Sequence, residues 1–154
     1  MNFVALDKLD PSTFLPLLND AVVRKHLVGH EPFTLETVQE WVQEKLCIDA
    51  MDGYLVRAIC VADELIGWCG IQPDHNEAEL AIVLAPTHWG YGRRVFEYLM
   101  DCSRTFGHRY VVFHLLDSRR EYKALRKFAN DVFQTRLMGR NFTTYKLAVR
   151  GQFQ

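Results

Sequence analysis

The most informative stretch of this sequence is Ala78-Glu79-Leu80-Ala81-Ile82-Val83-Leu84-Ala85-Pro86-Thr87-His88-Trp89-Gly90-Tyr91-Gly92-Arg93-Arg94-Val95-Phe96. Its first part is β-rich and predicts a strand over 77–84. A proline and two glycines then predict a loop over 86–92. From residue 93 to about residue 106 the apolar side chains recur at helical spacing, which predicts a helix that ends before Gly107.

The turn between this strand and this helix has the chemistry of an anion site. The first N–H groups of a helix have no intrahelical partner and lie at the positive end of its dipole. Gly90 and Gly92 let a ligand approach the backbone, and Arg93 and Arg94 add positive charge where the dipole disfavours arginine. A nearby phosphate would explain both arginines. The alternative is an ordinary strand-to-helix turn, since neither G-x-G-x-x-G nor G-K-[ST] is present.

The segments around this stretch predict a mixed architecture. The further expected strands are 3–6, 54–61, 65–71, 109–116, 134–138 and 142–149. Further helices are expected from Asp10-Pro11, over 34–47, and from Ser118, which opens an S-x-x-E capping box. A turn is expected over 73–76. This order predicts the α/β (α+β) class, with one central, mixed, mostly antiparallel sheet of about six or seven strands and about four helices on both faces.

Composition excludes several classes of protein. The chain has 154 residues, of which 49% are apolar and 24% charged, and this globular composition predicts a single domain over 1–154. The formal net charge of −1 argues against a duplex-DNA binder. No secretion signal and no eighteen-residue apolar run is visible, and the cysteines form no C-x-x-C pair. We therefore expect a cytoplasmic protein with reduced thiols and no membrane segment.

Three motifs lie in the informative stretch, each separated from the next by two residues. They are Ala78-Glu79-Leu80-Ala81, Leu84-Ala85-Pro86 and Trp89-Gly90-Tyr91-Gly92-Arg93-Arg94. The pattern resembles the acetyl-CoA-binding core of the GCN5-related N-acetyltransferases (GNAT). It is most similar to the branch containing ribosomal-protein N-terminal acetyltransferases, which reads A-E-L-G, L-x-P and W-G-x-G-Y-A. Segments 33–41 and 65–70 resemble the family's second helix and its L-I-G-x-x-G strand, so the resemblance covers about residues 1–149.

The sequence departs from the family pattern in two places. The broader loop motif, Q/R-x-x-G-x-G/A, falls either on 87–92, where Thr replaces the Gln or Arg, or on 89–94, where Arg replaces the last small residue. The helix expected after residue 116 begins with Ser118, where the family often has Asn. Leu125 stands where the family often has the Tyr that protonates the departing thiolate.

The resemblance implies an enzyme that moves an acetyl group from acetyl-CoA to an amine by direct attack. It implies that pantetheine docks on the backbone at the end of the 77–84 strand and that the pyrophosphate docks on the following N–H groups. The implied CoA-contacting residues are Val83, Leu84, Gly90, Tyr91, Gly92, Arg93, Arg94, Val95 and Ser118. For Ser118 the capping box alone is the alternative explanation.

Glu79 is the candidate catalytic residue. In some family members a glutamate near this position acts as general base, often through water; the alternative is a sheet carboxylate paired with Arg or Lys. Lesser candidates are His75, His88, Tyr122 and Tyr145. We predict no metal, because four other histidines show no metal-ligand spacing: His26, His30, His108 and His114.

The sequence leaves the acceptor open among a protein N-terminus, a lysine, an aminoacyl-tRNA and a small amine. The competing hypothesis is a non-catalytic GNAT-fold module that binds CoA, a protein or RNA, which the imperfect loop motif motivates. A basic strip from residue 119 to residue 140 would serve RNA, although ordinary solvated helix charge is the preferred explanation. A homodimer is compatible with the sheet ends, but no sequence feature identifies an interface.

Overall fold

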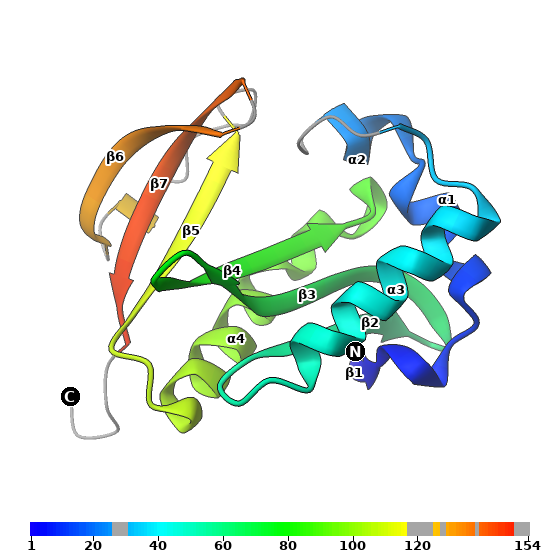
Figure 1. Cartoon of the computed structure of the whole chain (residues 1–154), viewed down its shortest axis with the longest axis horizontal. Helices are drawn as coiled ribbons and strands as arrows, with labels where there is room; N and C mark the ends of the chain where they lie inside the picture. Colours follow the sequence, from blue (N-terminus) through cyan, green and yellow to red (C-terminus); the bar gives the residue numbers. More distant parts are fainter. Residues whose placement is uncertain (26–30, 117–124, 127–128, 138, 150–154) are drawn as a thin grey trace.

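The computed structural model describes residues 1–25, 31–116, 125–126, 129–137 and 139–149. One seven-stranded sheet runs through the described residues (Figure 1). Its strands are β1 (Asn2–Ala5), β2 (Leu55–Val61), β3 (Glu64–Asp74), β4 (Glu77–Leu84), β5 (Tyr110–Leu116), β6 (Ala129–Leu137) and β7 (Arg140–Ala148). The spatial order is β1-β2-β3-β4-β5-β7-β6, in which β4 and β5 are parallel and all other neighbours are antiparallel. The predicted mixed, mostly antiparallel sheet is confirmed.

The junction between β4 and β5 is much shorter than the other strand pairings. β3 and β4 pair along their length, from Gly67 opposite Leu84 to Asp74 opposite Glu77. β4 and β5 share a single pair, Glu79 opposite Val112. Beyond that pair the two strands diverge toward their C-terminal ends (Figure 1). The edge of β4 after Glu79 therefore lacks a ladder partner among the described residues.

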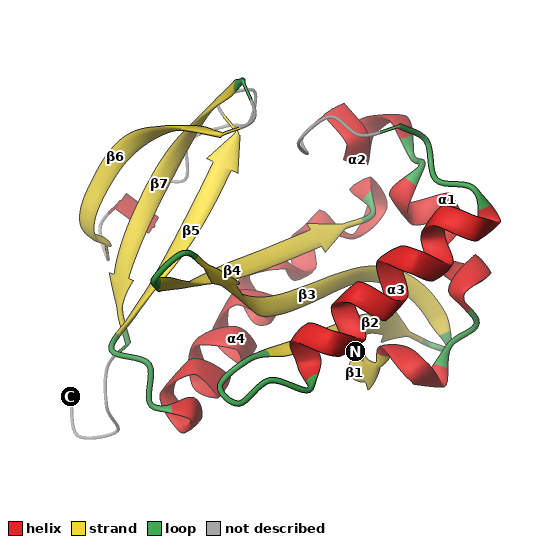
Figure 2. Cartoon of the chain, in the orientation of Figure 1, coloured by secondary structure: helices red, strands yellow, loops and turns green. Residues whose placement is uncertain are grey.

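Helices cover both faces of the sheet (Figure 2). On one face, α3 (Leu35–Asp49) packs with the N-terminal 3₁₀ and α-helical turns η2 (Pro11–Phe14), α1 (Leu15–Leu18) and α2 (Ala21–Lys25). On the other, α4 (Gly92–Phe106) buries Val95 and Leu99 against β3, β4 and β5. Because strand residues alternate between faces, even-numbered β4 residues face α4 and odd-numbered ones face α3.

The helix expected after Asp10 is broken into short pieces. Asp10 caps as predicted, since its carboxylate accepts from the Ser12 backbone N–H at 2.9 Å. The chain then turns at Asn19, whose side chain exchanges two hydrogen bonds with the Phe33 backbone. Asp20 starts α2 by accepting from the N–H groups of the next turn. These side-chain bonds compete with helix continuation, which hydrophobic periodicity alone does not reveal.

Other boundaries shift by a few residues. The turn expected over 73–76 is shorter, because β3 and β4 extend into it and leave His75 at a φ of +54° in the connection. The expected loop over 86–92 is the 3₁₀ helix η3 (Pro86–Tyr91), and α4 begins at Gly92. The closing hairpin is longer than predicted, with strands at 129–137 and 140–148. Gly107 ends α4 in the left-handed region at a φ of +84°, as predicted.

Candidate active site

Glu79 lies at the point where β4 and β5 separate. It pairs with Gln72 of β3 on one side and with Val112 of β5 on the other. Its side chain is on the α3 face and 27% exposed. The position places a half-buried carboxylate next to the opening between the two strands.

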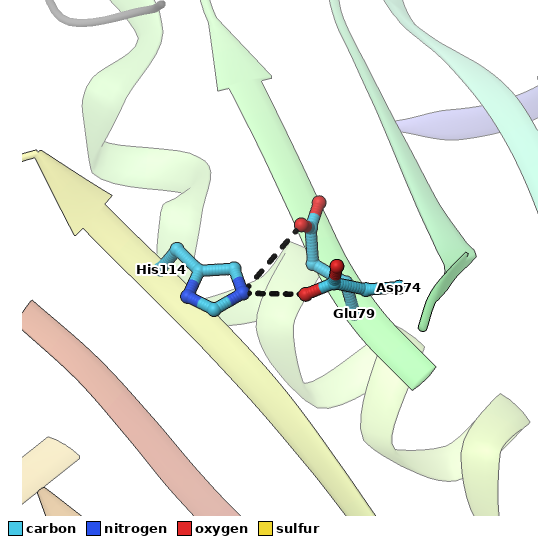
Figure 3. A group of neighbouring side chains, drawn as sticks. All are labelled: Asp74, Glu79 and His114. Carbon is cyan, nitrogen blue, oxygen red and sulfur yellow. Dashed lines mark hydrogen bonds and ion pairs between the residues drawn. The ribbon is translucent and has the colours of Figure 1, made fainter. Parts of the chain in front are cut away.

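Three side chains from three strands meet at this position (Figure 3). His114 of β5 has its Nε2 atom 2.8 Å from Asp74 Oδ2, at the end of β3, and 3.8 Å from Glu79 Oε2. The other ring nitrogen, Nδ1, is 2.7 Å from the Thr144 hydroxyl of β7. The Thr144 hydroxyl in turn donates to Thr135 Oγ1 of β6 at 2.8 Å. A hydrogen-bonded cluster thus crosses most of the C-terminal half of the sheet.

The surroundings of Glu79 raise its pKa above the ordinary value for a glutamate. Burial raises the pKa of Glu79, because a carboxylate loses hydration there. The charge of His114 opposes this effect, the carboxylate of Asp74 adds to it, and the charge of Lys45 and a hydrogen bond from Gln72 lower the pKa again. A carboxyl whose pKa is raised toward the working pH is suited to proton transfer.

Lys45 of α3 lies beside this cluster, on the α3 face of the sheet. Its Nζ atom donates to Gln72 Oε1 at 2.6 Å and lies 5.0 Å from the centre of the Trp68 ring. Burial lowers the pKa of Lys45, partly offset by the charges of Glu44 and Glu79. Trp68 Nε1 is buried with no hydrogen-bond partner in the described part of the chain, so a donor remains on this face for water or a ligand.

Sequence reasoning found Glu79 but missed Asp74 and His114. The donor atoms of the three residues lie within 4.8 Å of one another, a spacing and chemistry that also suit a divalent cation. Hydrogen bonds within the cluster account for the arrangement without one. The predicted absence of a metal site stays a prediction. No local spacing reveals this group, because its members come from separate strands.

The start of α4 has the openness that an anion requires. A Cβ added at Gly90 would meet nothing within 4 Å, and one at Gly92 would meet only Leu84 Cδ1 at 3.9 Å. Neither glycine has a positive φ, so the fold itself does not demand glycine there. The helix has no side-chain N-cap bond, and its first backbone N–H, that of Gly92, donates to the Trp89 carbonyl of η3.

The side chains around this turn are arranged as follows. Trp89 is 46% exposed, and its Nε1 atom donates to the Leu84 carbonyl at 3.1 Å, tying η3 to the end of β4. Arg93 pairs with Glu97 at 3.2 Å, and the Arg94 guanidinium lies 5.8 Å from the Tyr91 ring centre. Val83, Leu84 and Val95 have buried side chains, so only their backbone groups are available to a ligand.

Among the described lesser candidates, only His75 touches the cluster around Glu79, with its Nε2 atom 4.0 Å from Asp74 Oδ1. The His75 side chain is exposed, and His88 contacts the Thr87 hydroxyl at 2.8 Å. Tyr145 is buried on the α4 face, on the other side of the sheet. Ser118 and Tyr122 lie outside the described residues.

Comparison with known proteins identifies the family. A sequence profile of the acetyltransferase (GNAT) domain matches residues 1–118. The chain belongs to the GNAT acetyltransferase family. GNAT enzymes use acetyl-CoA, and the family assignment is consistent with acetyl-CoA-dependent acetyl transfer. No functionally curated protein matches the sequence.

Solved structures share the GNAT fold at low sequence identity. An N-acetyltransferase from Staphylococcus aureus Mu50 superposes with a TM-score of 0.73 at 15% identity, over 97% of each chain. A ribosomal-protein-alanine N-acetyltransferase from Brucella melitensis gives 0.71 at 15% identity, over 96% of this chain and 98% of that one. YncA of Salmonella typhimurium, solved with its cofactor acetyl-CoA, gives 0.69 at 15% identity, over 97% and 92%. These likenesses establish the fold.

None of the helices in the described part of the chain has the length and apolar character needed to cross a bilayer.

Proposed function

We propose that this GNAT protein transfers the acetyl group of acetyl-CoA to a primary amine, with Glu79 as general base. The observation that carries the proposal is the place of Glu79, at the one residue pair that joins β4 to β5. A carboxylate there is next to the unpaired edge of β4, and burial raises its pKa. The family assignment supports the acetyl donor, and the acceptor class is part of the proposal.

The residues present fit acetyl-CoA. The unpaired edge of β4 offers the backbone groups of Val83 and Leu84 to the pantetheine. The open positions at Gly90 and Gly92 let a ligand approach the backbone at the start of α4, whose N–H groups would hold the pyrophosphate. Tyr91, Arg93, Arg94 and Val95 complete this turn, and Ser118 remains a proposed contact. When bound, acetyl-CoA supplies an activated acetyl group as a thioester.

The chain's own residues then prepare the acceptor. The Glu79 carboxylate faces the α3 side of the sheet, away from α4, so we place the acceptor on that side. The ionised carboxylate takes one proton from the acceptor ammonium, directly or through one water, and leaves a neutral amine with a free lone pair. The amine nitrogen then bonds to the thioester carbon and the carbon–sulfur bond breaks. The nitrogen loses a second proton, and the departing CoA thiolate takes up one proton through solvent. Lys45 and Gln72 line the same face and hold the carboxylate in place.

The seven-stranded sheet supports a single domain over 1–154. The family profile ends at residue 118, yet β7 lies between β5 and β6 in the same sheet. The segments on either side of residue 118 therefore share one sheet.

Calorimetric titration with acetyl-CoA, and separately with CoA, tests the donor site. We expect micromolar binding to the wild-type protein and its loss in Gly92→Trp, whose indole would fill the open turn. Phe106→Trp, at the exposed far end of α4, is the matched control and should bind normally. Absence of binding at millimolar ligand would overturn the proposal.

An amine panel, with the acetylated product detected by mass spectrometry, tests the transfer. The panel contains a peptide N-terminus, a lysine peptide, an aminoacyl-tRNA and a small polyamine. Product from one class identifies the acceptor.

A non-catalytic CoA-binding module is the second candidate. The observation that favours it is Arg94, which stands where one register of the loop motif requires a small residue. Its side chain lies near Tyr91 at the mouth of the turn. CoA binding without turnover of any amine would support this candidate over the enzyme.

A further inference from the structure

The hydrogen bonds of His114 define where its protons are. The Thr144 hydroxyl donates its single hydrogen to Thr135 Oγ1. A hydroxyl has only one hydrogen, so toward His114 the Thr144 oxygen acts as an acceptor. The ring nitrogen Nδ1, at 2.7 Å, is therefore the donor and carries a proton.

The opposite nitrogen of the same ring faces negative charge. Nε2 lies 2.8 Å from Asp74 Oδ2 and 3.8 Å from Glu79 Oε2 (Figure 3). A neutral ring with its proton on Nδ1 would direct the Nε2 lone pair at two carboxylates. A ring protonated on both nitrogens donates to an acceptor on each side. The arrangement is satisfied by the imidazolium form.

We propose that Asp74 and the Thr144–Thr135 hydroxyl pair hold His114 as an imidazolium, whose charge keeps Glu79 ionised until the acceptor amine delivers its proton. The part of this inference that concerns catalysis rests on the proposed function of Glu79 as general base. His114 is a positioning residue here, because it acts on the base and does not touch the reacting atoms.

The charges that face Glu79 come from three packed elements. His114 of β5 and Lys45 of α3 are positive, whereas Asp74 of β3 is negative; Gln72 of β3 adds a neutral hydrogen bond. Among the charged groups, His114 has the largest effect on the pKa of Glu79. The His114 side chain is 10% exposed, so water screens its charge little.

Protons balance without a change on His114. The acceptor ammonium loses one proton to the Glu79 carboxylate, which becomes a neutral carboxyl group. The nitrogen gains its lone pair for attack, and His114 keeps both ring protons and its bond to Asp74. Replacing His114 by a neutral residue leaves Glu79 beside Asp74 with one fewer cation, so Glu79 holds its proton at a higher pH.

Nuclear magnetic resonance tests the protonation of His114 and its effect on Glu79, and it needs no acceptor amine. Long-range ¹⁵N–¹H spectra of the wild-type protein near neutral pH should show both nitrogens of the His114 ring protonated. Thr144→Val should lose the Nδ1 signature and Thr144→Ser should restore it. Thr143→Val, one residue along β7 with its side chain on the opposite face, is the matched control and should leave it unchanged. A bare nitrogen on the wild-type ring would overturn the proposal.

A ¹³C titration of the Glu79 carboxyl tests the effect on the base. In His114→Gln its midpoint should rise by roughly 1–3 pH units, the effect of removing one close opposite charge. Lys45→Met should raise it less. An unchanged midpoint in His114→Gln, or a wild-type midpoint that moves when EDTA is added, would overturn the proposal, the latter because a bound cation would then supply the charge. If amines are never acetylated, the proposed function fails, and these spectra still decide the state of His114.

Discussion

Glu79 stands opposite Val112 in the one residue pair that joins β4 to β5. This pair is the whole of the ladder between β4 and β5, and after it the two parallel strands diverge (Figure 1). The same residue therefore forms the link between the two strands and provides the half-buried carboxylate. A base at this position reaches the free edge of β4, where the proposed acetyl donor would lie.

Glu79→Gln should lower kcat for amine acetylation by roughly 10²- to 10⁴-fold, because the amide cannot accept the proton. Calorimetric affinity for acetyl-CoA should stay within about twofold, since the proposed CoA turn, residues 86–92 and the start of α4, is untouched. Glu77→Gln is the control on the same strand, where the carboxylate pairs with Lys146 at 3.3 Å. Equal losses in the two variants would argue against a specific role for Glu79.

The rate should fall at acidic pH over a range set by Glu79. The carboxylate is the active form, and burial raises the pKa of Glu79 above its ordinary value. The acid limb of kcat/KM should therefore lie at a higher pH than an exposed glutamate would give. Initial rates across pH 4 to 9, repeated in a second buffer at the same ionic strength, measure the position of this limb. A limb at the value of an exposed carboxyl contradicts the assignment.

Stability should depend on pH through the same residue. Because the folded pKa of Glu79 is raised, the folded state holds this proton more tightly than the unfolded chain does. That stabilising contribution is fully present below the ordinary glutamate pKa of about 4.3, and it is lost as pH rises through the raised folded pKa. Glu79→Gln should thus gain stability relative to wild type between acidic and neutral pH. Urea unfolding at several pH values measures the difference, and a constant difference would contradict the prediction.

Trp89→Phe should loosen the CoA turn. The substitution keeps a ring but removes the N–H that donates to the Leu84 carbonyl at 3.1 Å. The lost bond should cost about 1 kcal/mol of unfolding free energy and weaken CoA binding, because η3 is no longer tied to β4. Trp41→Phe, on α3 with its ring packed edge-on against the Trp68 ring, is a comparison that should leave CoA affinity unchanged. Unaltered CoA affinity in Trp89→Phe would show that the hydrogen bond from Trp89 to Leu84 does not position the proposed CoA site.

Substitution by alanine should lower the stability of the protein at Gly67 but not at Gly90. A Cβ at Gly67 would lie 2.2 Å from the Val83 carbonyl oxygen, where β3 and β4 pair. Gly67→Ala should therefore destabilise the protein by roughly 1–3 kcal/mol. Gly90→Ala meets nothing within 4 Å and should leave thermal stability unchanged while reducing CoA affinity. Comparable melting temperatures for both variants would refute the close approach at Gly67.

The sequence by itself determined most local elements, including the strand, the glycine-bearing turn and the helix over 77–106. Residues 77–84 form a strand and Gly107 ends the following helix, because alternation, helical spacing and glycine chemistry act over a few neighbouring residues. The order of these segments was enough to predict a mixed sheet with helices on both faces. The hydrophobic pattern predicted one helix after Asp10, and this was wrong where the side chains of Asn19 and Asp20 form hydrogen bonds that break it.

Only the tertiary structure decided the group around Glu79. Asp74, Glu79 and His114 belong to three strands, and the crossover from β4 through α4 to β5 separates His114 from the others along the chain. The parallel pairing of β4 with β5 brings them together, and β7 and β6 then add Thr144 and Thr135. The burial of the Glu79 carboxyl and the charges around it follow from these long-range contacts. Strand pairing determines the contacts, so no residue spacing within a single segment could have predicted them.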